Sequence, residues 1–378
     1  MSRLRTMQMT RWAGILLLSL CFTKSNAQVT GGQYAFAFLR LSNAPHISAL
    51  GGINVASTDD DIAFALQNPS LMRPSLHNEL ELTYNNYYAG ISVANLQYGY
   101  HSKELNTSFA FGVQYLNYGN FTQTDDLGNN LGTFTANDYA LTVAASHNYG
   151  DHWRAGVDLK YAHSQLFAGS AAAVLTDVGI SYYDTASQVC FGAVAKNMGL
   201  EVKKYVPGLS QEPLPFDLQM GITKQFKHIP LKLFTTIHHF YEWDIRYSNP
   251  ADVTTSTILG TDSVSSSSSS HFADILFRHF IFGGELTLAK RLTLTVSYND
   301  LMRSELALAS RTGVTGFSFG AALHLDKFQI HYARSYYHLA GAYNEIGITM
   351  ALNKLFGIGT TGEKIHWNET YKDEWSQD

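Results

Sequence analysis

The stretch Leu292-Thr293-Leu294-Thr295-Val296-Ser297-Tyr298 alternates large apolar residues with small polar ones. A β-strand points successive side chains to opposite faces, so this alternation predicts a strand with one apolar and one polar face. Related alternation recurs along most of the chain. The predicted strands cover residues 79–86, 89–101, 105–118, 133–147, 153–166, 173–183, 187–197, 215–226, 230–241, 274–288, 291–299, 313–325, 327–336 and 343–353.

The connections between these strands predict the architecture. Short turns follow the even-numbered strands, and longer loops follow the odd-numbered ones, apart from the short first hairpin near Tyr88. Barrels of bacterial outer membranes have an even strand count, short periplasmic turns and longer outer loops. The sequence therefore predicts an all-β membrane protein, a closed antiparallel transmembrane β-barrel of about 14 strands. A soluble propeller or sandwich is the alternative, but its strands would be nearer ~5–6 residues long.

The first 27 residues have the pattern of a secretory signal peptide. Arg3, Arg5 and Arg11 precede an apolar core at 13–22, and Ser25-Asn26-Ala27 resembles a cleavage site. This predicts export to the outer membrane as a multi-pass β-barrel. Cys190 is then the single cysteine of the mature chain, so no intramolecular disulfide is expected.

The composition agrees with a barrel whose apolar residues are interleaved with polar ones. Charged residues make up 15% of the chain, less than the ~25% typical of soluble domains, while aromatic residues make up 13%. The formal net charge is −5 and no basic stripe is present, so a nucleic-acid partner is not expected.

Residues 28–77 lack the alternation and precede the first predicted strand of the barrel at 78–353. Asp59, Asp60 and Asp61 lie near the start of the segment 58–75, which resembles a short capped helix that includes Asn68 and ends before Pro69. A barrel of this size has room for a lumen, so 28–77 is predicted to be an N-terminal plug containing these five residues. The remaining segment, 354–378, is predicted to be a periplasmic tail.

Several motifs resemble the PorQ family, outer-membrane components of the type IX secretion system, which is related to the PorV and FadL-like barrels. They are Phe38-Leu39-Arg40-Leu41, Ala44-Pro45, Ala49-Leu50-Gly51-Gly52, Asp59-Asp60-Asp61, Asn68-Pro69-Ser70-Leu71, Leu82-Thr83-Tyr84-Asn85, Gln114-Tyr115, Tyr118-Gly119, Ala136-Asn137-Asp138-Tyr139-Ala140-Leu141 and Pro213-Leu214-Pro215-Phe216-Asp217. The resemblance covers nearly all of the mature chain in order. The tail at 354–378 is longer than the resemblance to the PorQ family implies.

The resemblance implies an accessory role. Members of the family hold a PorZ-like protein at the cell surface within the complex that attaches cargo to lipopolysaccharide. The implied partners are a PorZ-like surface protein, PorU and PorV, together with outer-membrane lipid and lipopolysaccharide. The alternative function is a FadL-like transporter of small hydrophobic molecules. It would need an apolar pocket lined by Phe64, Leu66, Leu71 or Met72.

The loop between the ninth and tenth predicted strands holds the candidate partner-binding residues. Tyr241, Trp243 and Tyr247 lie at the start of this loop, before its serine run. Such aromatic residues belong either to a lipid-interface girdle or to a protein-binding patch. The serine run at 265–270 within the loop is expected to be a flexible linker.

No motif predicts an enzyme, a metal site or a cofactor. Asp59-Asp60-Asp61 suits a hard cation, but helix capping explains it better. His238 and His239 are expected to face opposite ways on one strand, which opposes a shared metal. The single histidines at 147, 163, 324 and 331 are expected to be hydrogen-bonded barrel residues. Ser318 lies in Gly316-Phe317-Ser318-Phe319-Gly320, the string of a hydrolase nucleophile, but within a predicted strand instead of the strand-to-helix turn that this chemistry needs.

Overall fold

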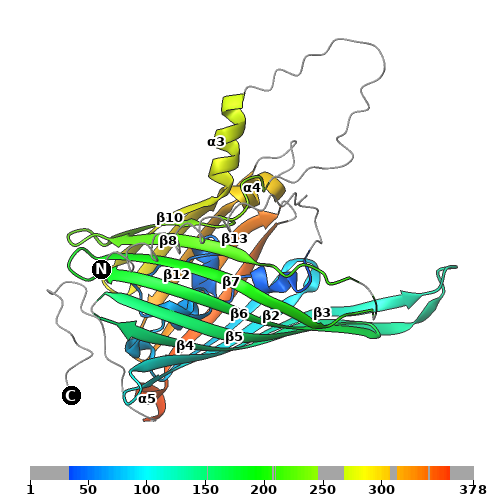
Figure 1. Ribbon diagram of the computed structural model, residues 1–378, viewed down its shortest axis with the longest axis horizontal. Helices are drawn as coiled ribbons and strands as arrows, with labels where there is room; N and C mark the ends of the chain where they lie inside the picture. The colour runs from blue at the N-terminus through cyan, green and yellow to red at the C-terminus, as the bar shows by residue number, and fades with distance from the viewer. Residues whose placement is uncertain are drawn as a thin grey trace, which may run out of the picture. The chain divides into compact units, whose positions relative to one another are not determined.

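The computed structural model describes residues 34–150, 152–206, 208, 210–245, 268–306, 313–338 and 341–357. The strands are β1 (Glu79–Asn86), β2 (Ser92–Ser102), β3 (Thr107–Thr124), β4 (Asn130–Tyr149), β5 (Trp153–Leu166), β6 (Gly169–Asp184), β7 (Val189–Lys203), β8 (Asp217–Gln225), β9 (Leu231–Ile237), β10 (Phe280–Leu288), β11 (Leu292–Asn299), β12 (Phe317–His324), β13 (Phe328–His338) and β14 (Gly341–Ala351). Each strand pairs with its sequence neighbours, and β1 pairs antiparallel with β14. Figure 1 shows the strands running side by side along the barrel. The sheet is therefore a closed barrel of 14 strands, which confirms the predicted architecture.

The two faces of the wall have opposite character. In β11, Leu294 and Val296 are exposed, whereas Thr293, Thr295 and Ser297 are buried. Exposed apolar side chains on other strands include Leu82, Leu96, Val113, Leu141, Leu159, Val178, Ile222, Leu233 and Ile346. Buried polar side chains include Glu81, Gln97, Asp158, Asp177, Glu285 and Glu345. A barrel with an apolar outside and a polar inside fits a lipid environment, because water would favour the reverse.

The helices of the described chain are short. They are η1 (Ala37–Arg40), α2 (Pro45–Ala49), η2 (Ile62–Leu66), η3 (Pro69–Leu71), η4 (Pro74–Leu76), η5 (Tyr88–Gly90), α3 (Ser268–Arg278), α4 (Asp300–Leu306) and α5 (Leu352–Phe356). None of these helices is long and apolar enough to cross a membrane.

The structure moves several of the predicted strand ends, including those of the ninth and tenth strands. The ninth strand stops at Ile237 instead of residue 241, and the left-handed φ of 53° at His239 takes the chain out of the extended conformation. Residues 274–278 belong to helix α3 instead of the tenth strand. Alternation over such a short stretch does not distinguish a strand from an amphipathic helix.

Two further expectations are wrong. The apolar phase slip between Val93 and Leu96 is no bulge, because β2 pairs with β1 and β3 in an unbroken register. Val93 is simply an apolar residue that points inward. Several loops after odd-numbered strands are also shorter than predicted. β6 begins at Gly169, leaving only Phe167 and Ala168 between β5 and β6.

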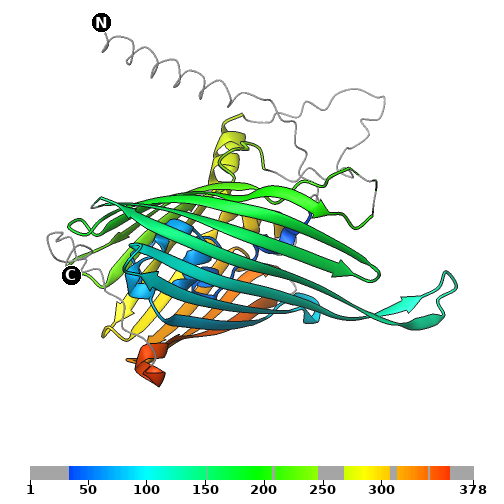
Figure 2. The ribbon, with the colours of Figure 1, turned by 60° about the horizontal axis from the view of Figure 1, so that its bottom comes forward.

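Residues 34–78, here called the inner segment, pack against the inner face of the wall. The segment carries η1, α2, η2, η3 and η4 and is drawn in blue inside the ring of strands (Figure 2). Helix α2 contacts β11 to β14, and η3 contacts β4 to β6, on another part of the ring. The segment therefore touches widely separated strands.

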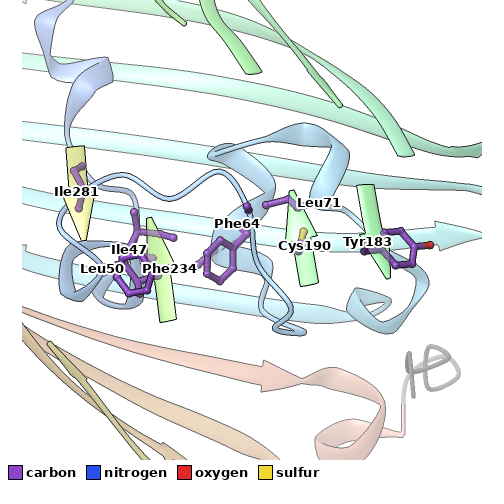
Figure 3. Close-up of a cluster of buried hydrophobic side chains, with 11 residues drawn as sticks. Ile47, Leu50, Phe64, Leu71, Tyr183, Cys190, Phe234 and Ile281 are labelled. Atoms are coloured by element: carbon purple, nitrogen blue, oxygen red, sulfur yellow. The ribbon is translucent and has the colours of Figure 1, made fainter. Parts of the chain in front are cut away.

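An apolar cluster joins the inner segment to the wall (Figure 3). Ile47, Leu50, Phe64 and Leu71 come from the inner segment and are almost fully buried. Tyr183, Cys190, Phe234 and Ile281 complete the cluster from β6, β7, β9 and β10. Cys190 is a buried free thiol. Burial of this apolar surface stabilises the contact between segment and wall.

Candidate functional site

A buried histidine of the inner segment lies between two carboxylates. His46 is the second residue of α2, directly after Pro45. Its Nδ1 lies 2.6 Å from Asp61 Oδ2, and its Nε2 lies 2.8 Å from Glu285 Oε1 on β10. The ring therefore connects two parts of the inner segment with the barrel wall.

The electrostatics of this group favour a protonated imidazole. Burial alone would lower the pKa of His46, but Glu285 and Asp61 together raise it well above its usual value. Burial alone would raise the pKa of Asp61, but the hydrogen bond and charge of His46 lower it to about 2. Each charge is thus compensated where water is excluded.

Lys232 of β9 extends the same cluster. Its ammonium group donates to Asp59 and also to Glu285 Oε2, 2.8 Å away. Thr295 on β11 donates to Glu285 Oε1 at 3.1 Å. Glu285 is therefore held by three donors from three different elements. We call His46, Asp59, Asp61, Lys232 and Glu285 the lumenal ionic cluster.

The three consecutive aspartates have three different partners. Asp59 pairs with Lys232, Asp61 pairs with His46, and Asp60 lies 3.6 Å from the Arg73 guanidinium. Asp61 Oδ1 also accepts the backbone N–H of Ala63 at 2.9 Å, as the N-cap of η2. The capping interpretation thus holds for Asp61, and the aspartates do not converge on one cation.

Asn68 and Pro69 lie where the inner segment touches the wall. Asn68 Oδ1 accepts the backbone N–H of Ser70 at the start of η3, and its Nδ2 donates to Val55 O at 2.9 Å. A Cβ added to Gly156 of β5 would meet the Pro69 carbonyl carbon at 2.4 Å. A Cβ added to Gly179 of β6 would meet Asn68 Oδ1 at 1.9 Å. Wall glycines therefore make room for the inner segment.

A second group of buried histidines lies at the rim of the barrel, just after β9. His238 Nδ1 lies 2.6 Å from His239 Nδ1, and the His239 backbone N–H donates to Asp217 Oδ1 at 2.7 Å. The prediction that these histidines face opposite ways is wrong, because the strand has ended before them. Asp217, His238 and His239 bring potential metal-ligating atoms within 4.8 Å of one another.

The protonation pattern at this rim cluster follows from its contact with Arg40. Arg40 donates to His239 Nε2, and since arginine only donates, that nitrogen must carry the lone pair. The proton of His239 is therefore on Nδ1 and points to His238. Burial lowers the pKa of both His238 and His239 to about 3, and the Arg40 and His279 charges act in the same direction.

The candidate partner-binding aromatic residues lie on the connection from β9 to β10. The Tyr241 hydroxyl donates to Phe216 O at 3.2 Å, and its ring is half exposed. Trp243 is 51% exposed; its ring lies 5.3 Å from that of Phe272 on α3 and stacks on that of His279 at 5.9 Å. Tyr247 lies outside the described residues.

Other candidate side chains serve the wall. Ser318 is fully buried on β12 and donates to the Tyr337 hydroxyl at 3.4 Å. His324 contacts Thr293 Oγ1 and Gln329 Oε1, and His147 contacts Thr107 Oγ1. His331 departs from this expectation: within the described part of the chain neither of its ring nitrogens has a hydrogen-bond partner.

The sequence alone does not predict His46, Lys232 and Glu285 as site residues. Their positions are separated by up to 239 residues, so no local spacing joins them. A charged residue on the inward face of a predicted strand is a signal for Lys232 and Glu285, because it needs a partner inside the barrel.

No family model and no curated protein matches this chain. Solved structures do match. The chain is similar to the CymD monoaromatic hydrocarbon channel at 13% identity and a TM-score of 0.47, covering 88% of this chain and 100% of that one. It is similar to a TodX monoaromatic hydrocarbon channel deltaS2 mutant at 14% identity and 0.46, covering 82% and 98%. A Pseudomonas aeruginosa FadL homologue matches at 12% identity and 0.41, covering 86% and 100%.

Proposed function

We propose that this protein is a closed outer-membrane barrel that holds a surface partner for the type IX secretion system. The inner segment acts as a plug, and the partner, a PorZ-like protein, docks on the extracellular connection from β9 to β10. PorU and PorV are further partners in the same complex. The resemblance to the PorQ family motivates the partner, and the packing of the lumen supports a role other than transport.

The single observation that carries the proposal is the attachment of the inner segment to the wall. The lumenal ionic cluster, the apolar cluster around Phe64 and the close contacts at Gly156 and Gly179 tie the segment to strands around the ring. A segment held at so many points stays in place, so the barrel works as a rigid carrier of its loops.

The transport alternative needs an apolar pocket near Phe64, Leu66, Leu71 and Met72. In the described chain, Phe64 and Leu71 pack within one apolar cluster and Met72 packs within another. The Leu66 side chain lies against Gly112 of β3. These contacts favour the accessory role over passage of a hydrophobic ligand.

The half-exposed aromatic residues of the β9–β10 connection form the proposed docking patch. Phe240, Tyr241, Trp243 and Phe272 are all exposed there, and such residues are frequent anchors in protein interfaces. Retention of the PorZ-like partner on cells tests this directly. Deleting the gene should release the partner into the medium and leave cargo unattached.

Complementation with variants sharpens that test. The variant Trp243→Ser should release the partner as the deletion does, whereas Phe167→Ser should retain it. Phe167 is also an exposed aromatic residue after an odd-numbered strand, so it is a matched control. Partner that stays cell-bound in the deletion strain would contradict the proposed function. Hydrocarbon or fatty-acid uptake that fails in that strain would favour transport.

A further inference from the structure

His331 is an unusual residue of the barrel interior. It lies on β13, is 2% exposed, and has no hydrogen-bond partner for either ring nitrogen within the described residues. Its ring stacks on that of His46, with centroids 5.6 Å apart and an interplanar angle of 24°. A buried imidazole with two unpaired nitrogens is costly, because each lost hydrogen bond leaves a desolvated polar atom.

The neighbours of His331 complete a metal-binding donor set. One ligand atom each of His46, Asp61 and His331 lies within 4.8 Å of the others. Two imidazole nitrogens and one carboxylate oxygen are ligands that Zn²⁺ and related transition metals accept, whereas Ca²⁺ and Mg²⁺ prefer oxygen alone. We propose that His46, Asp61 and His331 form a binding site for a divalent transition metal ion inside the barrel.

The surroundings of His46 suit such a ligand. Metal-bound histidines usually donate their second nitrogen to a carboxylate, which fixes the ring. Glu285 Oε1 lies 2.8 Å from His46 Nε2 and fills that role, while Lys232 and Thr295 hold Glu285 in turn. Asp61 Oδ1 is engaged by the Ala63 N–H, so Asp61 Oδ2 faces His46 Nδ1 and is the oxygen left to bind.

The required rearrangement is small. Ligand atoms bound tetrahedrally at ~2.0 Å lie roughly 3.3 Å apart, so His46 Nδ1 and Asp61 Oδ2 must separate from their 2.6 Å contact by under about 1 Å. The metal replaces the proton between these two atoms, and that proton leaves to water. Replacing a proton by a divalent ion adds one positive charge. Within the lumenal ionic cluster, only His46 and Lys232 otherwise balance the negative charges of Asp59, Asp61 and Glu285.

A cavity of about 490 Å³ lies at the end of the barrel that carries the short turns, lined by Ser75, His77, Glu79, His324, Gln329 and Thr349 among others. The His324 ring lies 6.1 Å from the His331 ring, centroid to centroid. His324 of the cavity lining is therefore a close neighbour of His331. Once bound at the proposed site, the ion would join α2, the start of η2 and β13.

Zn²⁺ titration of the purified full-length protein in detergent, after treatment with a chelator, tests the site. We expect one Zn²⁺ per chain, visible absorption bands with Co²⁺ typical of nitrogen and oxygen ligands, and a higher unfolding temperature in the metal-loaded protein. The variant His331→Phe keeps an aromatic ring in the stack and should weaken Zn²⁺ binding about tenfold or more. Asp61→Asn should do the same while an amide oxygen still caps η2.

The control variant is His238→Phe, which removes a buried histidine from the rim cluster. It should leave the Zn²⁺ affinity of the protein within about twofold of the original, since losses at or beside a metal site are typically tenfold or larger. The mobility of unheated samples in gel electrophoresis shows that each variant is folded. Wild-type protein that binds no Zn²⁺ would overturn the proposal. So would binding that survives both His331→Phe and Asp61→Asn, or that is lost in His238→Phe.

Discussion

Asn68 of the inner segment occupies the space where a side chain on Gly179 of β6 would lie. A Cβ at Gly179 would come within 1.9 Å of Asn68 Oδ1. That oxygen cannot turn away without loss, because it accepts hydrogen bonds from the Ser70 N–H at 3.1 Å and the Ser70 hydroxyl at 2.7 Å. The inner segment and the wall are therefore fitted to each other at the level of single atoms.

The variant Gly179→Ala should consequently destabilise the barrel. Overpacking of a close contact typically costs about 1–3 kcal/mol of unfolding free energy, measurable by denaturant unfolding of the protein in detergent or lipid. Gly169→Ala is the matched control on the same strand, since its added Cβ would meet the nearest atom at an ordinary 3.5 Å. Equal stability of the two variants would show that the segment does not press against β6.

Glu285→Ala should lower the stability more strongly. It leaves His46 and Lys232 buried without one of their carboxylates, and breaking a buried charge pair costs about 3–5 kcal/mol. Asp274→Ala breaks the exposed pair with Arg278 on α3 instead, where the expected loss is within about 0.5 kcal/mol. Similar losses in the two variants would mean that the lumenal ionic cluster is not buried as described.

A charged side chain at mid-strand on the outer face should lower the unfolding free energy of the barrel. Val296→Arg on β11 would place a guanidinium in lipid, with an expected loss of about 2–4 kcal/mol near the bilayer centre. Leu127→Arg, in the turn between β3 and β4 where Leu127 is 88% exposed, should change the stability by less than about 0.5 kcal/mol. Refolding into lipid vesicles measures both, and a tolerated Val296→Arg would argue against a membrane-facing wall.

Acidification should loosen the rim of the barrel. The pKa of His238 and His239 lies at about 3 in the fold, below the ~6.5 expected in the unfolded chain. Both rings face Arg40, Asp217 and His279. A lowered histidine pKa contributes stability fully above roughly pH 6.5, and this is lost as the pH falls from there toward 3.

The fluorescence of Trp243 reports this change, because its carbonyl lies 3.1 Å from His279 Nε2. The measurement uses protein in which Trp153, Trp367 and Trp375 are replaced by phenylalanine. A red shift should begin below about pH 6. It should disappear in the double variant His238→Gln and His239→Gln. An identical pH profile in that variant would contradict the assignment of the red shift to protonation of His238 and His239.

The sequence predicts the strands well where two faces differ, as in β11 with its Leu-Thr alternation. The prediction of strands fails where the apolar and polar faces are no longer distinct. His238 and His239 continue the chain after β9 without strand geometry, and residues 274–278 form a helix. Asp61 could be predicted as a cap from local spacing alone. The pairing of His46 with Glu285 could not, because only the closed barrel brings these residues together.

The proposed function requires that the inner segment blocks the lumen of the barrel. The conductance of a planar lipid bilayer containing the purified full-length protein tests this most directly, with a known porin as the positive control. The protein should insert without producing steps in current, since the lumenal ionic cluster and the contacts at Gly156 and Gly179 hold the segment in place. Stable stepwise conductance from the unmodified protein would contradict this account.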